Sequence, residues 1–314
     1  MNTDIDSHQK FALIGVAGYI APRHLTAMQS LGYDLVVAHD IFDSVGMIDR
    51  YFPHAYFTTD LNDFKKRIVT NRVDNLTVCT PNCFHCTHTI MGLEAGANVI
   101  CEKPLTLDSD DLSRMDACQH TTGRHIWPIL QLRLHPEIEK LKQLVENSDP
   151  YTTYDIDLTY ITPRGNWYAA SWKGDPSKSG GLVANIGIHF IDMLHWIFGT
   201  AEKVIVHHLS LDCAAGFLQL KKARVRYFLS VNPKHSPLHE SNPMSPYRHI
   251  TINGKDFNFT NGFTDLHTLS YDRIFAGKGF SLDDTRDSIN TLETIRQATV
   301  IGLTGDYHPL LRKL

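Results

Sequence analysis

A lysine in the sequence stands where acid–base chemistry on an alcohol could be carried out. Lys103 follows Glu102 and precedes Pro104, directly after a short apolar run typical of a buried strand. Proline fixes the backbone where such a strand ends, so the neighbouring polar side chain is delivered to the edge of a sheet. Burial or a nearby positive charge lowers the pKa of a lysine and lets it relay a proton. Taken alone, Lys103 would more often be a surface residue at the exit of a strand.

A histidine on a predicted helix is the second candidate for acid–base work. Residues 179–199 have helical periodicity, with one apolar stripe and a second, more polar stripe beside it that holds Asn185, His189, Asp192 and Trp196. Such a pair of stripes is expected where a helix borders a cleft. Asn185 and Asp192 could orient the imidazole of His189, although a single histidine on a half-apolar helix is more often structural.

A glycine-containing turn could bind a pyrophosphate. It follows an apolar run that begins at Phe11 and it opens a helical pattern, so its backbone N–H groups would meet an anion at a helix N-terminus. Asp40 ends the next apolar run, 22 residues beyond Gly18, where a carboxylate accepts hydrogen bonds from the adenosine ribose and repels a 2′-phosphate. The pattern therefore favours NAD over NADP, although the glycine spacing is degenerate and Asp40 could instead be a solvated loop residue. The predicted cofactor residues of this region are Gly15, Gly18, Tyr19, Ile20 and Asp40.

The order of the predicted elements indicates two domains. Apolar runs alternate with helical segments up to about residue 130, which predicts an α/β fold with an N-terminal Rossmann-type, doubly wound parallel sheet. Beyond it, period-two segments such as 154–160 and 225–231 predict a C-terminal α+β domain with an open, mostly antiparallel sheet. We expect a NAD-binding domain over 1–130 and a substrate-binding and oligomerisation domain over 131–314. The last helix, about 283–301, is expected to pack back on the first domain.

Composition argues against several classes of protein. With 42% hydrophobic residues and 20% charged residues in 314, the chain is an ordinary globular protein. A net charge of −4 without long runs of one sign argues against nucleic-acid and membrane partners, and the first residues lack a basic signal region, so we expect a cytoplasmic protein. Cys79, Cys83 and Cys86 lie near two histidines, but no second ligand pair follows at zinc-ribbon spacing, so we expect packing thiols and no metal.

Two short motifs carry a resemblance to a known family. Thr80-Pro81-Asn82 with His85, and the Glu102-Lys103-Pro104 turn, resemble the signature of the glucose-fructose oxidoreductase, inositol dehydrogenase and rhizopine-catabolism (Gfo/Idh/MocA) family. The resemblance implies that the helix 179–199 places a catalytic histidine, His189, opposite Lys103. Many members carry Asp where this chain has Asn185, so His189 is expected to be the weaker base here and Lys103 to carry more of the proton transfer. The cofactor residues implied by the resemblance are Thr80, Pro81, Asn82, His85, Glu102, Lys103 and Gln131.

The connection 162–175 is a candidate substrate loop. Arg164 and Lys173 suit a carboxylate or a diphosphate, while Trp167 and Tyr168 could cover a sugar face; the same loop could alternatively be an aromatic subunit contact. Arg133 and Arg248 are weaker candidates for binding an anion, and Asn185 is included among the substrate residues.

Within the family, this loop and the segments 132–136 and 262–271 look most like the bacterial UDP-N-acetylglucosaminuronate (UDP-GlcNAcA) 3-dehydrogenases. The resemblance implies oxidation of the sugar C3 hydroxyl by NAD, in the synthesis of lipopolysaccharide O-antigen precursors. It further implies that 2-oxoglutarate could be the electron acceptor, and that the chain forms a homodimer or homotetramer. Two alternatives stay open: a dehydrogenase of a free polyol or cyclitol, which would not need Arg164 and Lys173, and a NAD-binding sensor, which would need neither Lys103 nor His189.

Overall fold

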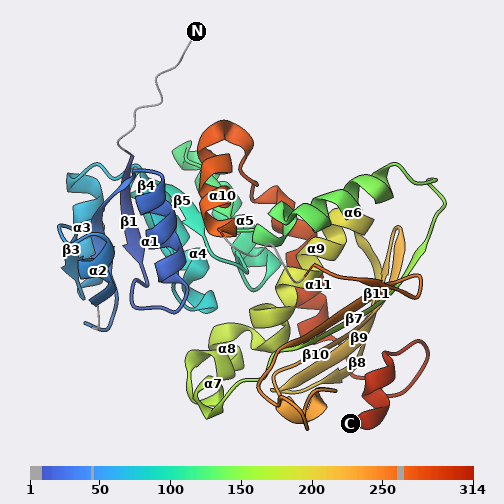
Figure 1. Ribbon diagram of the computed structural model, residues 1–314. Coiled ribbons are helices and arrows are strands. Elements are labelled where there is room, and N and C mark those ends of the chain that lie inside the picture. Colours follow the sequence, from blue (N-terminus) through green and yellow to red (C-terminus); the bar gives the residue numbers. More distant parts are fainter. Residues whose placement is uncertain (1–8, 44–45, 260–264) are drawn as a thin grey trace. The chain divides into compact units, whose positions relative to one another are not determined.

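The structure is a computed structural model that describes residues 9–43, 46–259 and 265–314. The chain divides into two compact units. The first unit comprises 1–134 together with 264–286, and the second comprises 135–263 together with 287–314. Each unit is built on its own six-stranded sheet (Figure 1).

The first unit is a doubly wound parallel sheet in the strand order β3-β2-β1-β4-β5-β6. Its central strands are buried on both faces because helices cover both sides, which is why they read as continuous apolar runs. The strands are β1 (Lys10–Ile14), β2 (Asp34–His39), β3 (Tyr56–Thr58), β4 (Asn75–Val78), β5 (Asn98–Cys101) and β6 (Ile126–Pro128). The helices are α1 (Ala21–Ser30), α2 (Gly46–Tyr51), α3 (Leu61–Thr70), α4 (His85–Glu94), α5 (Ser109–Thr122) and α10 (Leu266–Arg273).

The second unit is a mixed sheet in the order β12-β11-β7-β10-β9-β8, antiparallel except for the β7–β10 pair. Its strands are β7 (Tyr154–Ile161), β8 (Ala201–Leu209), β9 (Cys213–Leu220), β10 (Ala223–Ser230), β11 (Tyr247–Ile252) and β12 (Lys255–Phe257). Its helices are α6 (Pro136–Glu146), α7 (Asn166–Ala170), α8 (Pro176–Ser179) and α9 (Ile188–Phe198), with α11 (Arg286–Gln297) almost entirely in this unit. Together the two sheets confirm the predicted fold class.

The alternation along β7 separates two environments. Tyr154 and Tyr160 face α9, where their rings lie 5.5 and 5.0 Å from those of Phe198 and Phe190. Thr159, on the opposite face, hydrogen-bonds to His308 near the C-terminus. The predicted period-two strand thus has one face buried by a helix and a second face that is partly covered by the end of the chain.

A segment late in the chain is grouped with the first unit. The predicted boundary left everything after residue 130 in the second domain and sent the last helix back to the first. In the structure the returning segment is 264–286, whose helix α10 buries Tyr271 and Ile274 in the core of the first unit. The apolar stripe of α11 is buried too, and this helix is grouped almost entirely with the second unit; its packing on the first domain stays a prediction.

Among the described residues, one helical stretch, Pro176–Phe198, is long and apolar enough to cross a membrane. Of its most apolar 18-residue window, 78% is buried inside the structure. Its apolar face packs on the sheet of the second unit, which is the behaviour of a core helix in a globular fold.

Candidate active site

The glycine turn of the first unit closes tightly against β2 and β4. Gly15 has φ +87°, and a Cβ there would lie 2.7 Å from the carbonyl carbon and oxygen of Cys79, so only glycine fits. The Gly15 N–H donates to the carbonyl of His39, and that of Gly18 donates to the carbonyl of Gly15. The carboxylate of Asp40 is 8% exposed and accepts hydrogen bonds from the N–H of Ala17 at 2.9 Å and of Phe42 at 3.1 Å. Asp40 is therefore attached to the turn and held at the carboxyl end of β2.

The entry to α1 fits a bound anion. Ile20 precedes the helix and makes no side-chain cap hydrogen bond, Pro22 lies in its first turn, and that turn carries no acidic residue. Pro22 has no N–H, and those of Ala21 and Arg23 donate to the carbonyls of Gly18 and Ile20, so an anion here would be favoured by the dipole of α1 and by the absence of an acidic residue from its first turn. Tyr19 is 82% exposed beside it. Gln131, at the start of a 3₁₀ turn (Gln131–Leu134), has a buried Oε1 without a hydrogen-bond partner among the described residues. These features fit NAD, with Asp40 toward the adenosine ribose.

The two signature motifs are joined by one buried histidine. His85, the first residue of α4, places Nδ1 2.7 Å from the carbonyl oxygen of Pro104 and Nε2 2.9 Å from that of Thr80. Burial lowers the pKa of His85, while hydrogen bonds to the two carbonyls act to raise it. Thr80 also hydrogen-bonds to His88 through its hydroxyl. His85 therefore lies between the turn with Lys103 and the loop with Asn82, where its neutral ring donates to one of the two carbonyls at a time, rather than presenting its ring to a ligand.

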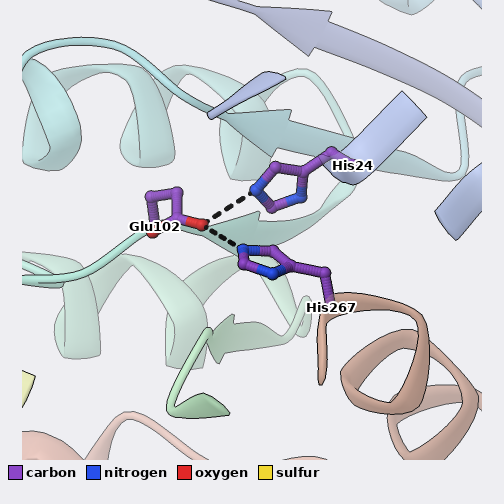
Figure 2. A group of neighbouring side chains, drawn as sticks. All are labelled: His24, Glu102 and His267. Carbon is purple, nitrogen blue, oxygen red and sulfur yellow. Dashed lines mark hydrogen bonds and ion pairs between the residues drawn. The ribbon is translucent and has the colours of Figure 1, made fainter. Parts of the chain in front are cut away.

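Three residues that the sequence analysis did not select surround Glu102. Its Oε1 accepts hydrogen bonds from His24 at 3.0 Å and from His267 at 2.9 Å (Figure 2). Tyr271 lies behind His24, with its hydroxyl 2.9 Å from Nδ1. Glu102, predicted as a cofactor residue, is 4% exposed, and its Oε1 is already hydrogen-bonded to the two histidines. No local pattern could have indicated this, because His24 and His267 lie 78 and 165 residues from Glu102 along the chain.

In the second unit, the predicted substrate loop gathers aromatic and cationic side chains. Trp167 is 55% exposed on α7, and its ring meets that of Tyr168 edge to face at 5.9 Å. The Lys173 ammonium lies 4.8 Å from the ring centroid of Trp172 and 5.9 Å from that of Trp167. Burial and then the positive charge of Arg164 lower the pKa of Lys173. The charges of Arg164 and Lys173 thus act on one another, and two cationic side chains on one aromatic loop are suited to binding an anionic ligand.

The helix of His189 is not regular. Residues 183–187 form a π-helical turn before α9, and Asn185 lies in it. Insertions of this kind recur at functional sites, because they turn side chains away from the ordinary helical register. On the stretch 182–198, Asn185, His189 and Trp196 are the positions that stay half-buried while their neighbours are buried, and Asp192 is buried at 4% exposure. The polar stripe predicted for this helix is thus its least buried side.

Arg248 is placed differently from the loop cations. It lies on β11, with its guanidinium 5.4 Å from the ring of Tyr160 and 4.9 Å from that of Phe259. Arg133, the other weak candidate, ion-pairs with Asp284 inside the first unit and is 3% exposed. The structure therefore gathers Arg164, Lys173 and the aromatic side chains, while Arg133 is held in a structural ion pair.

The cysteine cluster consists of thiols in packed surroundings. Cys79 and Cys86 are buried, and burial raises the pKa of both thiols, that of Cys86 to about 12. Neither is therefore a thiolate at neutral pH. Within the described ranges, the group of three metal-ligand side chains found close together is His24, Glu102 and His267.

Comparisons with known proteins cover most of the chain. A family model described as "Oxidoreductase family, NAD-binding Rossmann fold" matches residues 9–129, and one described as "Oxidoreductase family, C-terminal alpha/beta domain" matches residues 142–301. The WlbA (WbpB) dehydrogenase from Thermus thermophilus, solved with NAD and alpha-ketoglutarate, is 40% identical with a TM-score of 0.92, over 96% of this chain and 99% of that one. The same dehydrogenase solved with NAD and UDP-GlcNAcA gives a TM-score of 0.91 at the same identity and coverage.

Curated relatives are more distant. An uncharacterized oxidoreductase, ORF334 of Rhizobium meliloti, is 28% identical over 218 residues, which is 68% of this chain and 63% of that protein. The D-glucoside 3-dehydrogenase of Escherichia coli is 26% identical over 138 residues, 44% of this chain and 39% of that one. The chain thus spans less than two thirds of the length of these two relatives.

Proposed function

The chain belongs to the Gfo/Idh/MocA oxidoreductase family, and from that premise we propose that it oxidises the C3 hydroxyl of UDP-GlcNAcA to the 3-keto sugar. Membership confirms the predicted resemblance, the prediction of a NAD-dependent sugar dehydrogenase, and NAD as its cofactor.

The observation that carries the proposal is the pair of cations on the aromatic loop of the second unit. UDP-GlcNAcA brings a diphosphate and a carboxylate, and Arg164 and Lys173 supply two positive charges beside exposed Trp167. A free polyol or cyclitol is uncharged and offers no anionic group for these cations to bind. The likeness to a dehydrogenase solved with UDP-GlcNAcA supports the same reading.

The proposed chemistry divides the work between cofactor and protein. When bound, NAD supplies the acceptor for the hydride that leaves C3. His189 takes the proton of the C3 hydroxyl and Lys103 assists, so that the alcohol loses one hydride and one proton and becomes a ketone. Because Asn185 brings no negative charge to stabilise an imidazolium, Lys103 has a large share of the proton transfer. Exposed Trp167 covers the sugar, with the buried ring of Tyr168 packed against it. Asn185 and Arg248 complete the polar contacts of the sugar, and Asn82 borders the cofactor.

The remaining expectations belong to the same proposal. A 2-oxoglutarate molecule regenerates the oxidised cofactor, which the solved complex of the Thermus dehydrogenase with NAD and alpha-ketoglutarate supports. We further propose a cytoplasmic homodimer or homotetramer that acts in O-antigen precursor synthesis, without nucleic-acid or membrane partners. Sedimentation at micromolar concentration tests the assembly, since a stable monomer would refute it.

The activity is tested on purified protein with NAD and UDP-GlcNAcA, with and without 2-oxoglutarate. We expect reduced cofactor in the absence of 2-oxoglutarate and 2-hydroxyglutarate in its presence. Rapid reduction of NAD by a free polyol without turnover of the UDP-sugar would support the polyol dehydrogenase instead.

Two variants test the assignment of the acid–base residues. Lys103→Met and His189→Asn should each lose about 10²- to 10⁴-fold in kcat. His189→Asn should bind NAD like the parent, whereas Lys103→Met also removes a predicted cofactor residue and should bind NAD more weakly. A variant that binds NAD normally and turns over as fast as the parent would remove that residue from the mechanism. If both did so, a NAD-binding sensor would be the better description.

A further inference from the structure

Five polar side chains from distant parts of the sequence form one continuous hydrogen-bonded network inside the first unit. Thr77 on β4 contacts the Tyr271 hydroxyl at 2.8 Å, and that hydroxyl contacts His24 Nδ1 at 2.9 Å. His24 on α1 and His267 on α10 both reach Glu102. We call this set, Thr77, Tyr271, His24, Glu102 and His267, the Glu102 network. None of its members is more than 5% exposed.

Every hydrogen bond of the Glu102 network has a fixed direction. Burial acts to raise the pKa of Glu102, but hydrogen bonds from His24 and His267 outweigh it and hold that pKa well below its usual range, so the carboxylate only accepts. His24 Nε2 must then carry the proton. Burial lowers the pKa of His24, which leaves Nδ1 bare to accept from Tyr271, and Tyr271 accepts from Thr77 in turn. All donors therefore point toward one carboxylate.

The Glu102 network ends on the turn that carries Lys103. The second carboxylate oxygen of Glu102, Oε2, accepts the backbone N–H of Lys103 at 3.2 Å. On the other side of the lysine, the carbonyl of Pro104 lies 2.7 Å from His85 Nδ1. The residues before and after Lys103 are thus each attached to buried imidazoles, and the lysine backbone is attached to Glu102 itself.

Packing alone does not explain this construction. Burying a carboxylate with two imidazoles costs desolvation free energy, and well-packed apolar side chains of similar volume would stabilise the core at least as well. Tyr271 and His267 lie four residues apart on one face of α10, which reaches this core from far along the chain. The network ends on the turn of a proposed acid–base residue, Lys103. Its polar construction is explained if it fixes the position of that turn.

We propose that His24, His267 and Tyr271 are positioning residues for Lys103: they fix the Glu102 carboxylate, and through it the turn that presents the lysine to the substrate. The inference rests on the proposed role of Lys103. None of the three touches the reacting atoms; each acts through Glu102. The three ligand-type atoms of His24, Glu102 and His267 lie within 4.8 Å of one another, but the two imidazoles share one oxygen at hydrogen-bond distances, which favours protons over a metal ion between them.

The variants separate the hydrogen bond from the bulk of the side chain. His267→Leu fills the volume and removes the donor, whereas His267→Gln keeps an N–H near the position of Nε2. Tyr271→Phe removes only the hydroxyl. His207→Leu is the matched control, because His207 is equally buried and bonded through both ring nitrogens, to Gly302 and Asp306, but lies in the second unit.

The first readout is the single-turnover rate of cofactor reduction by UDP-GlcNAcA, followed across pH. We expect His267→Leu to slow this rate about 10- to 100-fold and to change its pH profile, with the KM for the sugar and the affinity for NAD within about 3-fold of the parent. His267→Gln should recover the rate to within about 3-fold of the parent. Tyr271→Phe should fall between the two, and His207→Leu should lower the unfolding temperature without slowing the reaction.

The second readout needs no activity. In protein without cofactor, hydrogen exchange of the Lys103 amide reports its bond to Glu102, and we expect it to accelerate in His267→Leu and to stay slow in His267→Gln. The inference would be overturned if folded His267→Leu kept the rate, the pH profile and the Lys103 amide exchange of the parent. It would also be overturned by a stoichiometric metal ion in the purified protein whose removal abolishes activity.

Lys103→Met, measured in parallel, separates the two hypotheses. If Lys103→Met turns over like the parent, the proposed role of Lys103 fails and the inference fails with it. If Lys103→Met is slow while folded His267→Leu is not, the inference alone fails.

Discussion

The Nδ2 group of Asn185 donates a hydrogen bond to the Tyr168 hydroxyl at 2.8 Å. This contact ties the π-helical turn that precedes His189 to the aromatic loop that carries Arg164 and Lys173. The asparagine therefore already has a structural role, in addition to any influence on His189. Asn185 thus joins the segment of the proposed base to the proposed substrate loop. We expect a substitution there to change the balance of proton transfer between His189 and Lys103.

Asn185→Asp tests that balance. A carboxylate keeps the contact, because the Tyr168 hydroxyl can donate to it, and it adds the negative charge that many family members have there. We expect the folded variant to make His189 a stronger base, because the charge favours the imidazolium, so the acid limb of the kcat profile should move to higher pH. The pH dependence of kcat measures this, with Asn185→Leu as the control that loses the contact and adds no charge. An unmoved acid limb would show that Lys103 sets the profile.

Asp40 sets the choice between the two nicotinamide cofactors. Its carboxylate is held by the N–H groups of Ala17 and Phe42, so it stays fixed at the end of β2. Asp40→Ser should raise the KM for NAD about 10-fold and narrow the preference for NAD over NADP, because the repulsion of a 2′-phosphate is removed. The ratio of kcat/KM for the two cofactors is the measurement. If the ratio stayed at the parental value, Asp40 would be a structural residue of the turn only.

Local signals in the sequence were sufficient where neighbouring residues determine the structure. Buried strands, the glycine turn, and Asp40 at the end of β2 all follow from short patterns, and so does the least buried stripe of the helix with His189. The Glu102-Lys103-Pro104 turn was found for the same reason, since its three residues are consecutive.

Contacts between distant residues were out of reach. His24 carries no local sign that its ring meets a carboxylate 78 residues away, and α10 looks like any short helix until its docking in the first unit is known. The π-helical turn at 183–187 was missed as well, because periodicity assumes an unbroken register. A Cβ added to Gly187 would collide with the side chain of Leu229, so packing on the sheet constrains this region.

Gly15 and Gly32 separate steric fit from backbone strain. Both have positive φ, +87° and +74°. A Cβ at Gly15 would meet the backbone of Cys79 and Thr80 at 2.7–2.8 Å, whereas no atom from the described part of the chain lies within 4 Å of one at Gly32. Gly15→Ala should reduce NAD affinity more than about 100-fold, because the turn must open to admit the methyl group. Gly32→Ala should cost about 1 kcal/mol of stability and leave NAD binding unchanged. Calorimetric titration measures the NAD affinity of the two variants, and thermal unfolding measures their stability. Equal NAD affinities for Gly15→Ala and the parent would contradict the close fit at Gly15.

The cations of the substrate loop should act on affinity more than on chemistry. Arg164→Met and Lys173→Met should each raise the KM for UDP-GlcNAcA about 10- to 100-fold, with kcat changed less, because each removes a charge-assisted contact to the ligand. Lys178→Met is the matched control: Lys178 is exposed on α8 and pairs only locally with Asp175, so its loss should change nothing measurable. An unchanged KM in both loop variants would favour the alternative hypothesis, that this loop is a subunit contact.

His308 makes the second unit sensitive to acid. The N–H of Leu310 donates to His308 Nδ1, so Nε2 carries the ring proton and donates to Thr159. Burial lowers the pKa of His308 to about 4, against the raising effect of Asp157 and with smaller lowering effects from Arg226 and His249. The unfolded chain, with its histidine pKa near 6.5, therefore binds more protons than the folded chain between about pH 6.5 and 4. Stability must fall as pH falls through that window, by about 2 kcal/mol at pH 5 from this residue.

His308→Asn tests the acid sensitivity with the hydrogen bond retained. The asparagine oxygen can still accept from the N–H of Leu310, but it does not titrate. The variant should be somewhat less stable than the parent at pH 7, because the packing against Phe228 is lost, and should lose less stability on going to pH 5. Urea unfolding midpoints at the two pH values, for parent and variant, give the comparison. Other buried histidines contribute equally to the pH dependence of both proteins. If parent and variant lost the same stability between pH 7 and pH 5, protonation of His308 would not destabilise the folded state.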